Sequence, residues 1–185
     1  MDKINLIIIG YFGLIALYGM AEIILLVKFD KGFRKKNDNS FFLMILPFYL
    51  SVYLPPAEYV LFRPSLHDGT LLVGFLLLIV GIFIRIIALL QLRHNFSTAV
   101  VIKENSRLVT DGLYRFIRHP LYLAVLLMTI PGSLIFSCLF TWIFVAVTLY
   151  GILLRIQKEE QSLKEHYPEY SAYMKRSRKL IPLIY

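Results

Sequence analysis

Charged residues and cysteines are both scarce in this chain of 185 residues. Only 17% of the residues are charged, while 58% are hydrophobic and the mean hydropathy is +0.67. An average soluble domain is about 25% charged and about 45–50% apolar, so the composition excludes an ordinary soluble domain and indicates a membrane protein. The single cysteine, Cys138, lies in an apolar run, which excludes both an internal disulfide and a multi-cysteine zinc site.

Two common site signatures are also missing. No GxGxxG occurs, and the polar segment 93–118 is too short for a βαβ unit, so a soluble Rossmann-type cofactor domain is excluded. His67 and His94 have no partner histidine at ligand spacing, so we expect no metal site. The net charge of +8 does not indicate nucleic-acid binding, because the basic residues lie in short segments between apolar runs. Any nucleotide-like cofactor must then be held by loops and helix ends.

Long apolar runs dominate the first half of the chain, 1–92. The runs 4–27, 41–62 and 70–92 each provide the roughly 20 residues that a helix needs to cross a bilayer core. Prolines interrupt the second run, at position 47 and again at 55 and 56, and are expected to kink that helix. We therefore predict three transmembrane helices in this half.

A further apolar stretch, 120–154, is interrupted by the sequence Pro-Gly-Ser at positions 131–133. Its two arms of about 12 and 20 residues fit a helical hairpin better than one helix. The predicted fold is an all-α integral membrane protein with about five transmembrane helices, of which the last two form a tight hairpin over 119–156.

The placement of basic residues predicts the orientation. Lys and Arg number five in 28–36, five in 93–118 and seven in 155–185, whereas the opposite ends of the apolar runs carry only Lys3 and Arg63. This bias places the N-terminus outside and the C-terminus in the cytoplasm. Because the first basic cluster follows the first apolar run, we expect a retained helix rather than a signal peptide. The connector 93–118 and the C-terminal helix and tail, 157–185, then face the cytoplasm together.

Charged residues inside the apolar runs are candidates for function. Arg85 lies about 12 Å and Glu22 about 9 Å from the cytoplasmic ends of their helices, at a rise of about 1.5 Å per residue. An ion pair between the two is plausible; the alternative is that Arg85 belongs to a polar cavity that receives a substrate headgroup. Glu58 lies near the outer end of its run and is predicted to reach water.

The sequence around His119-Pro120 predicts a helix start with binding capacity. Proline is favoured at the first helical position and restricts the residue before it, so His119 is placed just outside the helix. The free amides from Leu121 onward would suit a carboxylate or phosphate. Tyr114 and Tyr122 flank this start and are candidates for stacking on an adenine.

A simpler interpretation fits the same stretch, in which Arg115, Arg118 and the tyrosines are ordinary interfacial anchors. A second polar group stands at the end of the last apolar arm, where Arg155 and Glu159 are four residues apart and share one helix face. A surface ion pair is the usual meaning of this spacing. At the membrane boundary, however, the arginine is also placed to hold an anionic substrate head.

These residues resemble the isoprenylcysteine carboxyl methyltransferase family of membrane methyltransferases. The resemblance covers roughly 93–185, half of the chain, and its elements keep the family's order. The matching patterns are His94-Asn95-Phe96-Ser97, Leu108-Val109-x-x-Gly112-x-Tyr114-x-x-x-Arg118-His119-Pro120-x-Tyr122, Arg155-x-x-x-Glu159-Glu160-x-x-Leu163, Tyr167-Pro168-Glu169-Tyr170-x-x-Tyr173 and Leu180-Ile181-Pro182.

The resemblance implies S-adenosylmethionine in a cytoplasmic pocket built from the connector and the C-terminal helix. By analogy, Arg155 is the catalytic residue that faces the substrate, and Arg85 is a second candidate for substrate binding. The implied cofactor contacts are Ser106, Arg107, Leu108, Val109, Tyr114, His119, Pro120, Leu121, Tyr122 and Glu159. Position 106 is serine where many relatives have histidine, so a backbone contact is expected there.

The function implied is methyl transfer from S-adenosylmethionine to a lipophilic acceptor, first of all an isoprenylcysteine-like carboxylate. Other acceptors remain open on the same scaffold: a phospholipid amine, a lipid hydroxyl or alkyl-pyrone, or a small thiol. The non-enzymatic alternatives are a small membrane transporter and a structural membrane subunit, neither of which explains the paired motifs. The expected partners are the bilayer and a lipophilic or prenylated substrate, without metal or nucleic acid, and the oligomeric state is left open.

Overall fold

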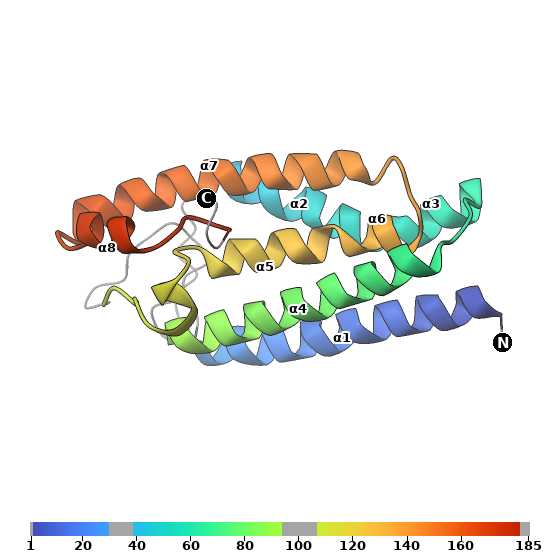
Figure 1. The fold of residues 1–185 in the computed structure, drawn as a ribbon, viewed down its shortest axis with the longest axis horizontal. Helices are drawn as coiled ribbons and strands as arrows, with labels where there is room; N and C mark the ends of the chain where they lie inside the picture. The colour runs from blue at the N-terminus through green and yellow to red at the C-terminus, as the bar shows by residue number, and fades with distance from the viewer. Residues whose placement is uncertain (1, 30–38, 94–106, 182–185) are drawn as a thin grey trace.

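The computed structural model describes residues 2–29, 39–93 and 107–181. Within these ranges the chain is helical and has no strand, apart from one isolated parallel bridge between Ile117 and Arg178. Figure 1 shows the long helices lying nearly parallel in an elongated bundle. The helices are α1 (Lys3–Phe29), α2 (Asn39–Tyr53), α3 (Pro55–Phe62), α4 (Asp68–Leu92), the 3₁₀ turn η2 (Gly112–Arg115), α5 (Pro120–Thr129), α6 (Pro131–Ile135), α7 (Trp142–His166) and α8 (Tyr170–Arg176).

The described helices fit a membrane protein. α1 and α4 are long and apolar enough to cross a bilayer, and the bent pair α2–α3 makes a third candidate if it counts as one span. All three agree with the predicted runs. α5 and α6 together form a shorter apolar stretch, and α7 changes from apolar to charged along its length. The fourth and fifth transmembrane helices therefore stay a prediction.

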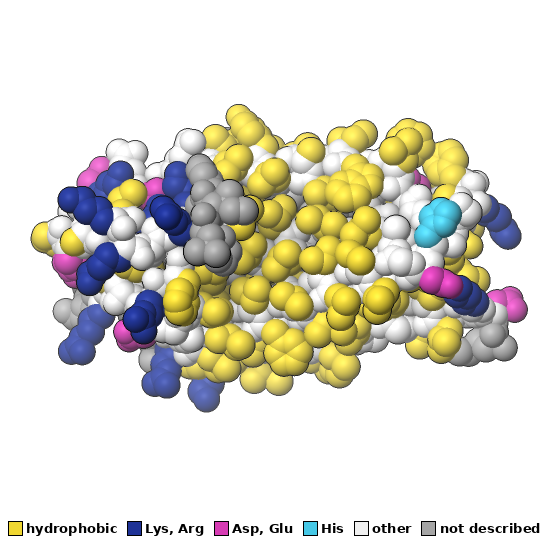
Figure 2. All heavy atoms as spheres, in the orientation of Figure 1, with side chains coloured by type: hydrophobic (Ala, Val, Ile, Leu, Met, Phe, Trp, Pro, Cys, Tyr) yellow, Lys and Arg dark blue, Asp and Glu magenta, His cyan; other side chains and the backbone are white. Residues whose placement is uncertain are grey.

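The surface of the bundle has an apolar middle and polar ends. Apolar side chains cover the middle of the face shown in Figure 2, whereas Lys and Arg gather mainly at the end that carries α8. Large apolar side chains such as Leu17, Ile24, Leu61 and Leu72 are more than half exposed. A surface of this kind needs lipid around it, because soluble proteins rarely expose contiguous apolar area of this extent.

The double proline at 55 and 56 separates α2 from α3, as predicted. The two helices meet at an angle of 46°. Proline has no N–H to donate to the preceding turn and its ring clashes with that turn, which breaks the helix at Leu54. Pro47, in contrast, is accommodated inside α2.

The predicted turn of the hairpin is misplaced. Pro131 begins α6, which continues the direction of α5, because proline is well suited to the first turn of a helix. The chain instead reverses over 136–141, where Ser137 has a positive φ of 53°. α7 then runs back beside α2 and α5 (Figure 1).

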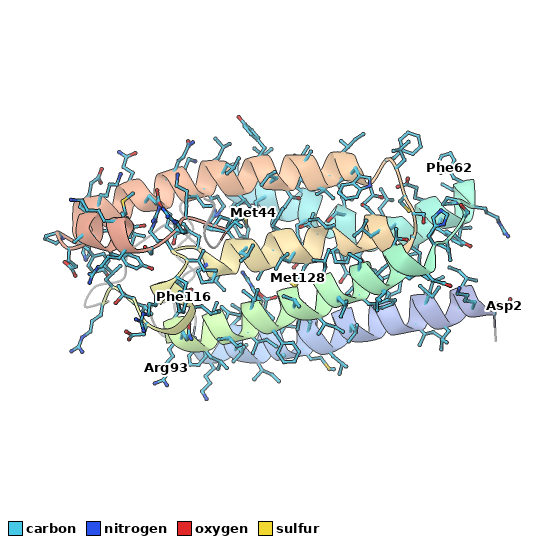
Figure 3. All side chains as sticks on the ribbon, viewed as in Figure 1. Asp2, Met44, Phe62, Arg93, Phe116 and Met128 are labelled. Atoms are coloured by element: carbon cyan, nitrogen blue, oxygen red, sulfur yellow. The ribbon has the colours of Figure 1, made fainter. Side chains whose placement is uncertain are left out.

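Close packing fixes α7 against α2. A Cβ atom at Gly151 of α7 would lie 2.8 Å from the backbone nitrogen of Met44, so only glycine allows this approach. Met44 of α2 and Met128 of α5 are both buried in the interior of the bundle (Figure 3). The tight contact sets the rotation of α7 and thereby decides which of its polar side chains face inward.

Glu58 was predicted to reach water, and this prediction is wrong. Its side chain is buried, and its carboxylate accepts backbone hydrogen bonds from Leu139 (2.7 Å), Phe140 (2.8 Å) and Thr141 (3.0 Å), with a further bond from the Thr141 hydroxyl. A negative charge is favoured at this position, because the three amides immediately precede or cap the N-terminus of α7. Glu58 thus links α3 to the start of α7.

Candidate active site

The candidate site lies at the basic end of the bundle, which we define as 107–122, 155–166 and 170–180. This end is opposite to the one that carries Asp2 and Phe62 (Figure 3). It combines η2, the start of α5, the last turns of α7, and α8 with the segment that follows it. The polar residues that the sequence singled out within 114–122 and 155–159 are therefore brought to one end, together with α8 and the segment after it.

A glycine allows η2 to form against α4. Gly112 has a φ of 58°, in the left-handed region, and a Cβ atom there would lie 2.0 Å from the side-chain nitrogen of Gln91. The Gln91 carbonyl oxygen in turn accepts a hydrogen bond from the Leu113 amide (3.0 Å). These contacts hold Tyr114, which follows in η2, in a buried position.

α5 begins at Pro120 with His119 just before it, as predicted. The amides of Tyr122 and Leu123 both donate to the His119 carbonyl, at 3.1 Å each. The helix start therefore offers fewer free donors than its sequence suggested. Its contribution to a binding site must come largely from side chains.

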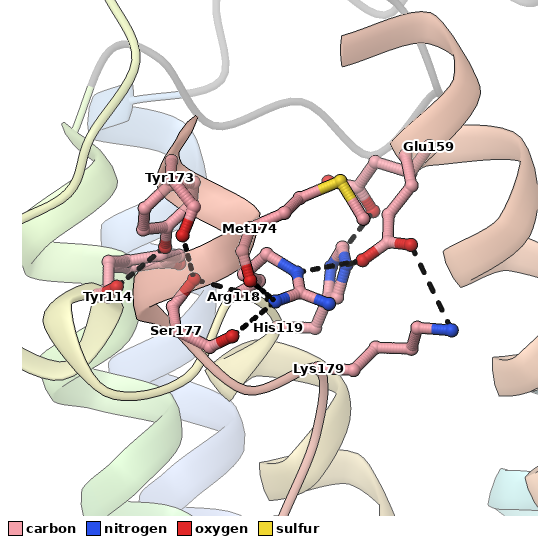
Figure 4. Close-up of polar contacts among 9 residues, drawn as sticks. Tyr114, Arg118, His119, Glu159, Tyr173, Met174, Ser177 and Lys179 are labelled. Carbon is pink, nitrogen blue, oxygen red and sulfur yellow. Dashed lines mark hydrogen bonds and ion pairs between the residues drawn. The ribbon is translucent and has the colours of Figure 1, made fainter. Parts of the chain in front are cut away.

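The buried carboxylate of Glu160 lies among three basic side chains of the basic end, Arg118, His119 and Lys179, which are labelled in Figure 4. Its Oε1 accepts hydrogen bonds from Arg118 Nε at 2.9 Å and from His119 Nε2 at 3.3 Å, and its Oε2 lies 3.9 Å from Lys179 Nζ. Burial alone would raise the pKa of the Glu160 carboxyl, but the bonds from His119 and Arg118 outweigh it and lower the pKa to about 2. Glu160 is thus ionised at neutral pH.

Residues 178–179, which follow α8, form backbone hydrogen bonds with residues 116–119, which precede α5. The amide of Arg118 donates to the Arg178 carbonyl (2.8 Å), the Arg178 amide donates to the Phe116 carbonyl (2.9 Å), and the His119 amide donates to the Lys179 carbonyl (3.2 Å). The Arg118 guanidinium also donates to the carbonyls of Met174 and Ser177. Arg118 is therefore a buried structural residue, not the interfacial anchor that the sequence allowed.

Arg155 is buried at the point where the apolar interior meets the basic end. Only 3% of the residue is exposed, and its Nε donates to the Tyr122 hydroxyl at 3.2 Å. Its guanidinium carbon lies 5.3 Å from the centre of the Phe41 ring of α2, within cation–π range. One turn later, Glu159 is about a third exposed, and its carboxylate lies 3.9 Å from His119 Nδ1.

Arg85 pairs with Glu22 across α1 and α4, as the depths of the two residues suggested. Arg85 Nη2 and Nε donate to Glu22 Oε1 at 2.6 and 3.1 Å, and Tyr18 donates to the same carboxylate. The ion pair is largely buried. Burial raises the pKa of Tyr114, and the charge of Arg85 acts in the opposite direction.

Comparisons with known proteins are in agreement with this architecture. The family model of the isoprenylcysteine carboxyl methyltransferases matches residues 72–165, slightly more than half of the chain. The chain belongs to this family. It is 26% identical to the protein-S-isoprenylcysteine O-methyltransferase of Schizosaccharomyces pombe, over 95% of this chain and 83% of the yeast protein. A probable protein-S-isoprenylcysteine O-methyltransferase of Oryza sativa subsp. indica is 30% identical, over 60% of this chain and 61% of the plant protein.

The fold is also shared with a solved structure. The eukaryotic intramembrane Ras methyltransferase of the isoprenylcysteine carboxyl methyltransferase family superposes with a TM-score of 0.68 and 23% identity. The match covers 96% of this chain and 67% of the solved chain. The described helices therefore have the membrane fold of this methyltransferase family.

Most of the residues implied by the family resemblance meet at the basic end. Leu108 packs on a cluster of buried tyrosines at positions 167, 170 and 173. Arg107 is exposed and Val109 is partly buried. Ser106 and the pattern at 94–97 lie outside the described residues. Among the described residues, no group of three or more His, Cys, Asp or Glu side chains is arranged to hold a metal ion.

Sequence reasoning missed Glu160, the buried carboxylate that accepts hydrogen bonds from Arg118 and His119. Glu160 stands next to Glu159 in the family pattern, but only Glu159 was singled out. The signal was available, because Ile152, Ile156 and Glu160 are spaced four residues apart and therefore lie on one face of α7. That face is buried in the structure, which turns the Glu160 carboxylate inward and leaves Glu159 nearer to solvent.

Proposed function

We propose that this chain transfers a methyl group from S-adenosylmethionine to the carboxylate of a prenylated cysteine. The observation that carries the proposal is the buried guanidinium of Arg155, which stands between the apolar bundle and the polar basic end. A prenylated cysteine has the same division, an apolar chain joined to an anionic head. A guanidinium at this boundary can hold the anionic head through charge-assisted hydrogen bonds.

The residues at the basic end fit the cofactor. S-Adenosylmethionine would lie against 107–109, Tyr114, the 119–122 turn and Glu159, with a backbone contact at Ser106. The Tyr114 hydroxyl is buried and has no hydrogen-bond partner among the described residues, and the Glu159 carboxylate is partly exposed beside His119. These groups supply a donor for an anionic or hydroxyl edge and an acceptor for ammonium or ribose hydrogens.

When bound, S-adenosylmethionine would supply the methyl group: the ester O–CH₃ bond would form as the sulfonium S–CH₃ bond breaks, and S-adenosylhomocysteine would leave. Arg155 would orient that carboxylate through charge-assisted hydrogen bonds, and its contact with Tyr122 fixes the guanidinium. No general base is needed, because the acceptor is already deprotonated at neutral pH. The protein's contribution is therefore to hold the reactants in line and to exclude water.

The same arginine distinguishes between the acceptors left open by the sequence. A phospholipid amine is protonated for much of the time at neutral pH, and a buried guanidinium beside it is repulsive. A carboxylate is attracted by the same group. We therefore favour the carboxylate acceptor over the amine, the hydroxyl and the thiol.

The basic end is proposed to face the cytoplasm, with the N-terminus on the other side of the membrane. Lys and Arg gather at this end of the bundle (Figure 2), and an excess of basic residues is typical of cytoplasmic membrane ends. The prenyl chain would then lie among the apolar helices while its carboxylate meets Arg155.

The proposal is tested with detergent-purified protein, radiolabelled S-adenosylmethionine, and N-acetyl-S-farnesylcysteine as acceptor. The carboxamide of the same compound is the matched acceptor control. We expect base-labile label in the acid and none in the carboxamide. Equal labelling of both compounds, or of neither, would contradict the assignment of the acceptor.

The role of Arg155 is tested in the same assay with Arg155→Ala. We expect kcat/KM for the acceptor to fall by about 10²–10³-fold, because a buried charged contact contributes about 3–4 kcal/mol. Affinity for S-adenosylhomocysteine should change less than about twofold. Arg115→Ala, at an exposed arginine of the same end, is the control. Parallel loss of catalysis and cofactor affinity in Arg155→Ala would instead place this residue in the cofactor site.

A further inference from the structure

Two buried tyrosine hydroxyls at the basic end have no hydrogen-bond partner among the described residues. They belong to Tyr114 in η2 and Tyr170 at the start of α8. Tyr170 is only 1% exposed and Tyr114 only 6%. Buried polar groups are nearly always paired in folded proteins, so each unpaired hydroxyl requires an explanation. Tyr170 is not among the residues that the family resemblance implied for cofactor binding.

Tyr114 and Tyr170 both contact Tyr173, the first through its backbone carbonyl and the second through its ring. Tyr173 of α8 donates its hydroxyl to the Tyr114 carbonyl at 2.5 Å, which ties α8 to η2 (Figure 4). The rings of Tyr170 and Tyr173 are 5.8 Å apart and meet edge to face. Leu108, from the segment that precedes η2, packs on the same tyrosines. Tyr170 is therefore held beside residues that are proposed to contact the cofactor.

Burial and the nearby carboxylates both favour the protonated phenol at Tyr114 and Tyr170. Burial raises the pKa of Tyr114 and of Tyr170. The next contribution comes from Glu159 at Tyr114 and from Glu160 at Tyr170, and Glu159 acts on both tyrosines. A protonated phenol without a partner can still donate one hydrogen bond to an acceptor atom of a ligand. The acceptor must come from outside the described side chains.

We propose that Tyr170 is a further cofactor-binding residue, and that its hydroxyl donates a hydrogen bond to an acceptor atom of S-adenosylmethionine, together with Tyr114. The inference rests on the proposed function, because that function brings the cofactor to this end. It extends the site from the helix bundle to α8. α8 is held in place by Tyr173 and by the backbone bonds at 177–179. The C-terminal segment then supplies a ligand contact as well as structural support.

Tyr170→Phe separates this role from a structural one, because the two make opposite predictions. Removing an unpaired buried hydroxyl should leave the Tm of the cofactor-free protein unchanged or higher, since no protein hydrogen bond is lost. The Kd for S-adenosylhomocysteine, measured by calorimetry in detergent, should rise about tenfold. Tyr173→Phe is the matched control: it loses the bond to Tyr114 and should lower the Tm of the cofactor-free protein.

The outcomes are distinguishable. A tenfold weaker Kd with an undiminished Tm supports the cofactor contact. A Kd within twofold of wild type overturns the inference and leaves the proposed function intact. A Tm lowered as in Tyr173→Phe also overturns it, because the hydroxyl then has a partner within the protein. Failure of the wild-type protein to bind S-adenosylhomocysteine overturns the inference and the proposed function together.

Discussion

Two buried glutamates stand near opposite ends of α7 and are satisfied in different ways. Glu58 accepts hydrogen bonds from three backbone amides and a hydroxyl immediately before the helix. Glu160, in the charged part of the helix, accepts from Arg118 and His119 and lies near Lys179. The first carboxylate is surrounded by neutral donors and the second by basic side chains.

The difference supports the proposal that ligands bind at the basic end of the bundle. The Glu58 carboxylate is stabilised by neutral amides at a helix start. Its hydrogen-bond partners among the described residues include no basic side chain that could also bind an anionic ligand. At the basic end, Arg155 is a buried cation whose Nε donates to the Tyr122 hydroxyl. This end therefore combines a hydrogen-bonded structural group around Glu160 with the side chains that are proposed to bind the ligands. The comparison can be tested by removing each carboxylate in turn.

The largest effect is expected for Glu160→Ala. It leaves the buried Arg118 guanidinium without its carboxylate, and loss of one partner of a buried ion pair costs about 3–5 kcal/mol. The free energy of unfolding in detergent, or the Tm, should fall accordingly. Glu165→Ala on the same helix removes an exposed carboxylate and should change stability by less than about 0.5 kcal/mol. Equal effects of the two substitutions would contradict the central role of Glu160.

A smaller loss is expected for Glu58→Gln. The amide keeps one oxygen for backbone donors, but its NH₂ group must face another donor, which costs about 1.5–3 kcal/mol. Stability should fall without a change in affinity for S-adenosylhomocysteine, because Glu58 lies at the end away from the site. Thermal unfolding and calorimetry on the same preparation measure the two quantities. A parallel fall in cofactor affinity would mean that the two ends are coupled.

Lowering the pH should destabilise the folded protein by protonating the Glu160 carboxylate. The pKa of Glu160 in the folded protein, about 2, lies below its ordinary value of 4.5, so its stabilising contribution is complete above about pH 4.5. It is lost progressively as the pH falls toward 2. We expect the Tm of wild type to fall more steeply than that of Glu160→Gln between pH 5 and pH 3. Parallel slopes would show that Glu160 is not the titrating group.

The smallest effect is expected for Tyr173→Phe. This change removes one hydrogen bond, from the Tyr173 hydroxyl to the Tyr114 carbonyl, with a cost of about 1 kcal/mol. The Tm should fall by a few degrees, less than for Glu58→Gln. A loss as large as that of Glu160→Ala would mean that α8 is held mainly by this bond rather than by the backbone contacts at 177–179.

The helices of the first half could be predicted from the sequence because their signals are local. The apolar runs predict α1, the α2–α3 pair and α4, and Pro55 breaks α2 from α3 as expected. The Glu22–Arg85 ion pair could be predicted because the two residues lie at similar distances from the predicted cytoplasmic ends of their helices. The start of α5 at Pro120 followed from proline geometry alone.

The features that were missed depend on contacts between distant parts of the chain. Proline usually breaks a helix when it lies in the interior, but Pro131 stands at the first position of α6, where proline is favoured. The partners of Glu58 are more than 80 residues away along the chain. The choice between Glu159 and Glu160 depends on the rotation of α7, which the packing of Gly151 against α2 decides. The contacts of Pro131 and Glu58 have no signature within a short window of sequence. For α7, the four-residue spacing of Ile152, Ile156 and Glu160 was a local signal of the inward face.

The most direct test of the account is calorimetric binding of S-adenosylhomocysteine to the wild type, Glu58→Gln and Glu160→Gln, all in the same detergent. We predict saturable binding by the wild type, an unchanged Kd for Glu58→Gln, and a Kd at least about tenfold weaker for Glu160→Gln, because Glu160 positions His119 in the site. Absence of binding by the wild type, or equal Kd values for all three proteins, would contradict a cofactor site at the basic end.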